Sequence, residues 1–141
     1  MFSMAAGDSK LSKLLESYLR STGWLTAVRG NNVLAKRDEL SVVIELEDIE
    51  GYVRIACPTN LELKSYEEMK RVLVKNFTWR GVKASLDPDG FLVLLVEVER
   101  ARFEERVRSV TADALNKLAK SLRDICAELE KSSSRGTHES L

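Results

Sequence analysis

The chain has 141 residues, 44% of them hydrophobic and 31% charged, and its 22 basic and 22 acidic side chains cancel to zero net charge. This composition argues against wholesale disorder, and the longest apolar run, Phe91 to Val96, is far too short to span a membrane. Interspersed charge without a basic excess argues against a dedicated nucleic-acid binder. The length favours a single domain that buries a core without metal or disulfide.

An amphipathic helix is expected over residues 9–22, after a flexible leader at residues 1–8 that shows no secretory signal. Its apolar residues recur at helical spacing and form one stripe of Leu11, Leu14, Leu15, Tyr18 and Leu19. Asp8 or Ser9 is placed to cap its start, and Gly23 stands where a glycine in the left-handed conformation closes a helix.

A β region follows, in which we expect three or four strands. Residues 24–29 and 33–37 flank a Gly-Asn-Asn loop typical of a hairpin, and the count depends on whether 24–29 forms a full strand. Residues 40–47 alternate in polarity, as a strand with one buried face does. Residues 52–57 should pair back against them, and Pro58 should end that strand.

A second helix is expected to begin at a capping box formed by Ser65 and Glu68. Its buried stripe should consist of Tyr66, Met69, Val72 and Leu73. Asn76 is expected to close the helix in the left-handed conformation. Phe77 and Trp79, in the loop after it, are expected to anchor the chain in the core.

A hairpin of residues 81–86 and 91–98 is expected around Asp87-Pro88-Asp89-Gly90, whose residue types suit a tight turn. The second strand is apolar at nearly every position, so both of its faces need cover. One face should pack on the helices. The other carries Phe91, Val93 and Leu95, which we expect to lie at an interface.

The last helix is expected to run from Ala101 to Lys131, which at 1.5 Å per residue would reach roughly 45 Å. That length exceeds the expected width of the domain. Either the helix kinks near Thr111, or its C-terminal half projects and packs on something else. A narrow apolar seam of the kind that a partner helix covers consists of Leu115, Leu118, Leu122, Ile125 and Leu129. Residues 132–141 are polar and expected to be disordered.

These elements predict one α+β domain over residues 9–131, ordered α-β(3-4)-α-β-β-α. Its C-terminal helix should be long.

No group of residues points to catalysis, a cofactor or a metal site. Asp87 and Asp89 fit a turn better than an acid/base pair. Cys57 and Cys126 are interpreted as buried, reduced thiols. The single histidine, His138, lies in the tail, and with two distant cysteines it builds neither a nucleophile pair nor a zinc site. We therefore expect a protein that is not an enzyme and holds no cofactor.

The order of the elements resembles the type III secretion chaperone-like fold, which includes the Tir chaperones and the YbjN-like family. The resemblance covers roughly residues 11–125 and rests on a leucine-rich helix that ends in Asn plus an apolar residue, followed by a hairpin through an acidic-Gly loop. These features fall on Leu73, Asn76, Phe77, Leu86, Asp87, Asp89 and Gly90. The resemblance implies an antiparallel, twisted sheet with helices packed mainly on one face. It also implies homodimers that bind segments of other proteins. Secretion chaperones are usually acidic, so we carry over binding and not secretion to this neutral chain.

The surplus apolar surface and this resemblance favour a cytoplasmic homodimer that binds an unidentified protein or peptide, with no nucleic-acid or membrane partner. One alternative is a nucleic-acid-associated factor that uses arginines of the third helix, namely Arg100, Arg102, Arg106 and Arg108. Acidic residues interleave with these arginines, so ion pairing along the helix explains them better. The other alternative is a small-molecule sensor or enzyme with its site in the concavity of the sheet.

Overall fold

The computed structural model describes residues 6–139, with side chains described for residues 10–47 and 50–131. Its elements are α1 (Ala6–Ser21), β1 (Leu25–Arg29), β2 (Asn32–Arg37), β3 (Leu40–Ile49), β4 (Tyr52–Glu62), α2 (Tyr66–Thr78), β5 (Lys83–Leu86), β6 (Phe91–Glu99), α3 (Arg100–Glu105) and α4 (Val107–Glu139). Parts of the expected leader and tail, residues 1–5 and 140–141, lie outside the described residues, as do the side chains of residues 132–139, His138 among them.

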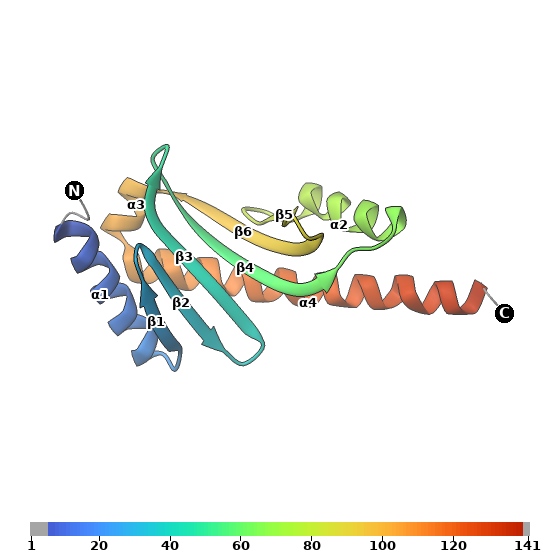
Figure 1. Ribbon diagram of the computed structural model, residues 1–141, viewed down its shortest axis with the longest axis horizontal. Helices are drawn as coiled ribbons and strands as arrows, with labels where there is room; N and C mark the ends of the chain where they lie inside the picture. The colour runs from blue at the N-terminus through green and yellow to red at the C-terminus, as the bar shows by residue number, and fades with distance from the viewer. Residues whose placement is uncertain (1–5, 140–141) are drawn as a thin grey trace.

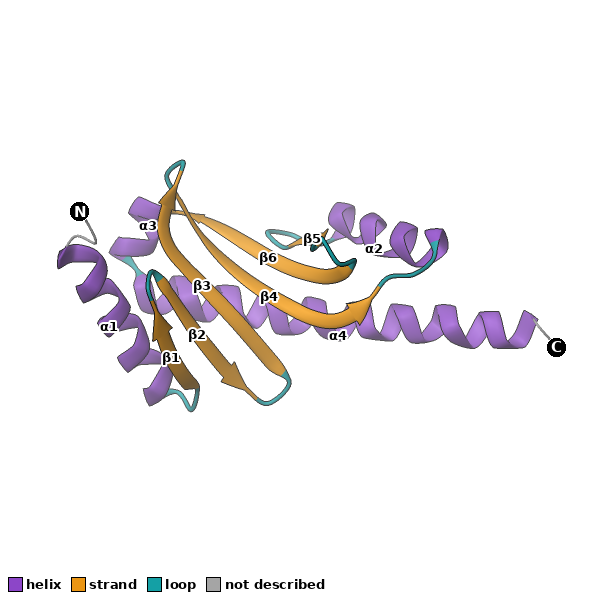
Figure 2. Cartoon of the chain, viewed as in Figure 1, coloured by secondary structure: helices purple, strands orange, loops and turns teal. Residues whose placement is uncertain are grey.

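The strands form one six-stranded antiparallel sheet in the order β1-β2-β3-β4-β6-β5 (Figure 1). The segment 24–29 does contribute a full strand, so four strands precede α2. In Figure 2 the strands lie in front of α4, and the helices gather on the far side of the sheet and at its two ends. The predicted α+β class, with its antiparallel sheet and long C-terminal helix, is confirmed.

Alternation along the strands shows which face holds the core. Leu92, Leu94 and Val96 of β6 are buried, whereas the residues between them are only partly covered. Helix α1 buries Leu11, Leu15 and Leu19 against the same core but leaves Leu14 exposed. The apolar stripe of α1 is therefore narrower than the sequence predicts, since α1 lies at the margin of the sheet beside β1 and β2.

The ends of α1 show one confirmed and one incorrect prediction. Gly23 has a φ of 93° and donates its N–H to Arg20, while the Trp24 N–H bonds Leu19, the two bonds of a Schellman closure. The start is different, because α1 already begins at Ala6. Asp8 and Ser9 thus lie inside the helix and do not precede it.

Pro58 does not end β4, which continues to Glu62. The pairing of β4 with β3 stops at Ala56, and its register with β6 shifts after Pro58. The proline therefore sits at an irregularity, where sheets tolerate a residue without an N–H. The acidic-Gly turn after β5 forms as predicted, because the Asp87 carboxylate accepts from the backbone N–H groups of Asp89 and Phe91, both at 2.9 Å.

Helix α2 begins at the predicted capping box. The Ser65 hydroxyl accepts from the Glu68 N–H at 3.1 Å, and the Glu68 carboxylate accepts from the Ser65 N–H at 3.3 Å. The predicted end is wrong, because Asn76 is helical and α2 continues to Thr78. The Asn76 side chain instead binds the backbone of β5: its Oδ1 accepts from the Ala84 N–H at 2.7 Å, and its Nδ2 donates to the Ala84 carbonyl at 3.4 Å.

The C-terminal helix breaks at Arg106 and not near Thr111. Arg106 leaves helical geometry with φ −136° and ψ 53°, so that α3 packs on β4 and β6 before α4 turns along the sheet. Thr111 is fully buried within α4. The far end of α4 passes beyond the sheet and α2 (Figure 1), past the boundary expected at Lys131.

We predict that Asn76→Ala lowers the free energy of unfolding by about 1 kcal/mol, because it leaves the Ala84 N–H and carbonyl without their partner. Asn116→Ala is the matched control, since it replaces an exposed asparagine of α4 and should gain slightly from the helix propensity of alanine. Urea denaturation of both variants measures the difference. Equal stability of the two variants would contradict a role for Asn76 in holding β5.

Candidate functional site

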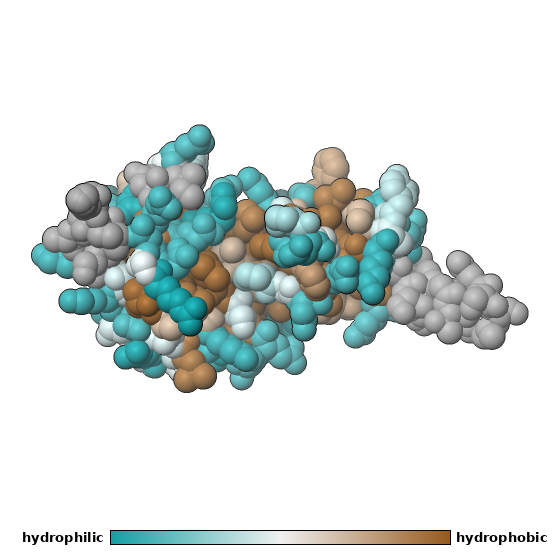
Figure 3. All heavy atoms as spheres, viewed as in Figure 1, coloured by the Kyte–Doolittle hydropathy of each residue, from teal (hydrophilic) through white to brown (hydrophobic). Residues whose placement is uncertain are grey.

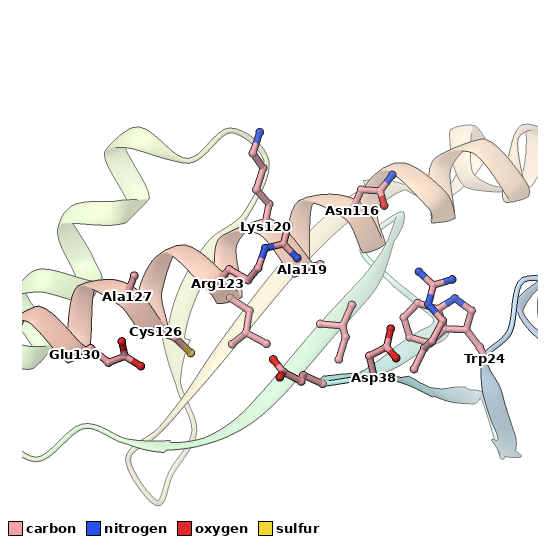
Figure 4. A pocket seen from close by; sticks show the side chains of 13 residues that line it. Trp24, Asp38, Asn116, Ala119, Lys120, Arg123, Cys126, Ala127 and Glu130 are labelled. Carbon is pink, nitrogen blue, oxygen red and sulfur yellow. The ribbon is translucent and has the colours of Figure 1, made fainter.

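An open groove of about 730 Å³ separates α4 from the end of the β2–β3 hairpin. In Figure 4, Trp24 and Asp38 lie on the hairpin side, and Arg123, Cys126 and Glu130 come from α4 on the opposite side. The Arg37 guanidinium lies over the Trp24 ring, 4.7 Å from its centroid, so a cation–π contact closes one end. The walls carry basic and acidic side chains together, and they therefore do not select one charge of ligand.

Both cysteines line a hollow that adjoins this groove. Cys57 is buried, and desolvation raises the pKa of its thiol to about 11. Cys126 is half-buried, and its burial, followed by the charge of Glu130, also raises its pKa. Both side chains are therefore thiols at neutral pH and weak nucleophiles. Among the side chains that the structure describes, in residues 10–47 and 50–131, no three His, Cys, Asp or Glu come together as metal ligands would.

The face of the sheet turned away from α4 carries an apolar row that crosses five strands in register. The row consists of Ala27, Leu34, Val43, Ala56 and Leu95, each paired with the next, and Lys83 of β5 stands at its end. In Figure 3, hydrophobic side chains are exposed between hydrophilic ones over this face. None of the helices in the described part of the chain covers it.

Charged residues border this apolar row on one side. The next register across the sheet aligns Arg29, Asn32, Glu45, Arg54 and Glu97. Arg54 lies between Glu45 at 3.9 Å and Glu97 at 3.8 Å, and Lys83 pairs with Glu97 at 3.0 Å. On the other side, a hollow of about 390 Å³ lies beside Leu25 and Pro58. The apolar row is thus bordered by charge on one side only, and that charged border is neutralised internally.

The three β6 residues predicted at an interface lie on this open face. Leu95 belongs to the apolar row, Val93 pairs with Pro58, and Phe91 pairs with Glu62. All three are half-buried by their neighbours within the sheet. The structure therefore brings them together with residues of β1 to β4 that the sequence did not single out, because the register between strands decides which side chains align.

The predicted seam of α4 is not a free surface. Leu115, Leu118 and Ile125 are buried, and Leu122 and Leu129 are partly buried against the same core. The seam needs no partner helix because α4 runs along the sheet and its second half packs on α2. Leu115, Leu118 and Ile125 are therefore not available to a partner, which corrects the prediction for these three residues.

Several predictions about which apolar residues of α2 are buried are wrong. Tyr66, Leu73 and Phe77 were expected in the core, but their exposed fractions are 79%, 57% and 94%. Only Val72 is fully buried, with Met69 partly so, because α2 turns that side toward β5 and α4. Both sides of α2 carry apolar residues, so periodicity alone could not identify the buried side. The exposed Val74, 52% accessible, extends this surface.

Polar contacts hold α2 on α4. The Trp79 indole N–H donates to Asp124 at 2.8 Å, and Lys75 pairs with Asp124 at 3.1 Å and with Glu128 at 3.5 Å. Arg71 adds a second contact to Glu128 at 3.1 Å. Trp79 is half-buried, packs against the core and also anchors α2 through its N–H. The Trp79 hydrogen bond, and then Lys75, lower the pKa of Asp124.

Comparison with known proteins identifies neither a family nor an activity for this chain. Neither a protein-family model, nor a curated protein, nor a solved structure matches the chain. No helix among residues 6–139 has the length and apolar character that crossing a membrane requires. The function must therefore be argued from three surfaces: the groove beside α4, the apolar row on the sheet and the exposed side of α2.

We predict that the free energy of unfolding of the Asp124→Asn variant falls less steeply with decreasing pH than that of the parent chain. A carboxyl group with a lowered folded pKa stabilises the fold above its unfolded pKa, and that contribution disappears as the pH falls through the folded pKa. This contribution to stability should be lost below about pH 4. Urea denaturation across the acid range measures it, with Asp113→Asn, which breaks the exposed pair with Lys117, as control. Parallel profiles for Asp124→Asn and the parent would contradict the prediction.

Proposed function

We propose that the chain is a non-enzymatic protein- or peptide-binding module, chaperone-like or regulatory, that acts as a homodimer. The observation that carries this proposal is the apolar row on the open face of the sheet, where five strands align small and medium apolar side chains in one register. Apolar surface that no element of the same chain covers is typical of an interaction site.

The dimensions of the apolar row favour an extended segment of another protein as its occupant. Five strands spaced about 4.8 Å apart give the row a length of roughly 19 Å, which is the span of about six extended residues. The charged border closes one side of the row, whereas Leu25 and Pro58 adjoin the other. An extended segment that presents every second side chain to the sheet fits along this row. The charges of the border pair with one another, so the segment's apolar side chains supply the affinity.

The groove beside α4 favours a second candidate function, that of a small-molecule sensor. Its volume falls within the range of ligand pockets, and Trp24 and Leu122 give it apolar walls. A ligand that binds only the folded chain raises its thermal stability, so a thermal-shift screen tests this candidate. The nucleic-acid alternative has less support, because Arg100 is engaged by Glu104 at 3.0 Å and by the Leu46 carbonyl.

We predict that Leu95→Lys weakens binding of a fluorescent decapeptide, alternating leucine and serine, by at least about 10-fold, because it replaces the last apolar side chain of the row, beside Lys83, with a charge. Ser85→Lys is the matched control, since it adds the same charge on the same face of β5 but outside the row. Fluorescence anisotropy measures both affinities. Failure of the parent chain to bind the peptide, or an equal loss in both variants, would overturn the proposed use of this row.

A further inference from the structure

The exposed side of α2 forms an apolar patch of Tyr66, Leu73, Val74 and Phe77, called here the α2 patch. With exposed fractions from 52% to 94%, these side chains present on the order of 500 Å² of apolar surface. That is as large as the largest apolar patch on a typical monomeric protein. It lies apart from the apolar row, on a helix at the β5 edge of the sheet (Figure 1).

The α2 patch is held in place and is not a loose segment waiting to fold back. On one side Asn76 binds both backbone groups of Ala84. On another, Lys75, Arg71 and Trp79 bind Asp124 and Glu128 of α4. Because Val72 already fills the space beneath the helix, α2 cannot rotate its exposed side into the core without breaking these contacts. The patch is therefore a preorganised surface.

The spacing of its apolar residues identifies the occupant. A two-fold interface brings residue i of one copy opposite residue j of the other and j opposite i, so its pattern must read the same in both directions. About a centre between Arg71 and Val72, Tyr66 maps onto Phe77, and the half-buried Met69 maps onto Val74. Leu73 maps onto Lys70, the one charged residue of this stripe, whose aliphatic stem can cover a leucine while its ammonium reaches water.

We propose that the α2 patch binds the α2 patch of a second copy of the chain, with the two helices antiparallel about a two-fold axis near Arg71 and Val72. This inference rests on the homodimer of the proposed function and assigns its contact surface. The antiparallel arrangement also sets the dipoles of the two helices in opposite directions, which is favourable for neighbouring helices.

The size of the contact predicts its strength. Two patches bury on the order of 1,000 Å² in total, near the lower limit of specific interfaces. The dimer should therefore dissociate on dilution. The open face of the sheet plays no part in this contact and stays accessible for an extended segment.

Sedimentation of the parent chain over a wide range of concentration should show a monomer–dimer equilibrium. Phe77→Asp should raise the dimer dissociation constant by at least about 100-fold, since it removes the most exposed aromatic of the patch from both halves of the contact. Leu25→Asp is the matched control, because Leu25 is 75% exposed on β1, far from α2 in sequence and at the opposite edge of the sheet. A parent chain that stays monomeric, or a Phe77→Asp variant that dimerises as well as Leu25→Asp, would overturn the proposal.

A crosslink tests the orientation of the helices. In a background with Cys57→Ala and Cys126→Ala, Lys70→Cys should give covalent dimers with a short bismaleimide, because position 70 lies close to the proposed axis. Lys10→Cys on α1 should not. Crosslinking at Lys10 but not at Lys70 would place the contact elsewhere.

Peptide binding reports separately on the proposed function: Phe77→Asp should bind the decapeptide as a monomer, whereas Leu95→Lys should dimerise without binding it.

Discussion

Six strands present side chains on two faces, and the described helices cover only one of them. That constraint shapes the molecule. The inner face takes the fully buried residues of β2, β3, β4 and β6, and α1, α3 and α4 pack against it. The outer face is left with a compromise: charged residues in one register, small apolar residues in the next, and partial burial throughout. A sheet covered on both faces would need apolar residues at every position, and only β6 approaches that composition.

Sequence reasoning located the features that depend on a few neighbouring residues. The capping box at Ser65, the Gly23 closure and the Asp87 turn each follow from contacts within about five positions, and all three form as expected. The element order and the antiparallel sheet followed from alternation and turn spacing. These features are local, so no knowledge of tertiary packing was required to find them.

The remaining features depend on contacts between segments distant in the sequence. Asn76 has the residue type of a helix end, but Ala84 supplies a partner that keeps it helical. Phe77 is a residue type that is usually buried, yet it is exposed because α2 packs its other side on β5 and α4. The seam of α4 looked unpartnered because the distance between α4 and the sheet cannot be read from periodicity. The apolar row was missed for a similar reason, since it exists only once five strands are set in register.

The Asn76 amide also bears on how this protein avoids aggregation. An edge strand with free N–H and carbonyl groups can recruit a strand from another molecule, and repeated recruitment builds a fibril. At β5, which is only four residues long, the Asn76 side chain occupies both groups of Ala84 in the way that a further strand would. Continuous growth needs two open edges on every molecule. With the Ala84 groups of β5 occupied, edge-to-edge stacking is disfavoured at this edge, and the Asn76 side chain thereby opposes an endless sheet.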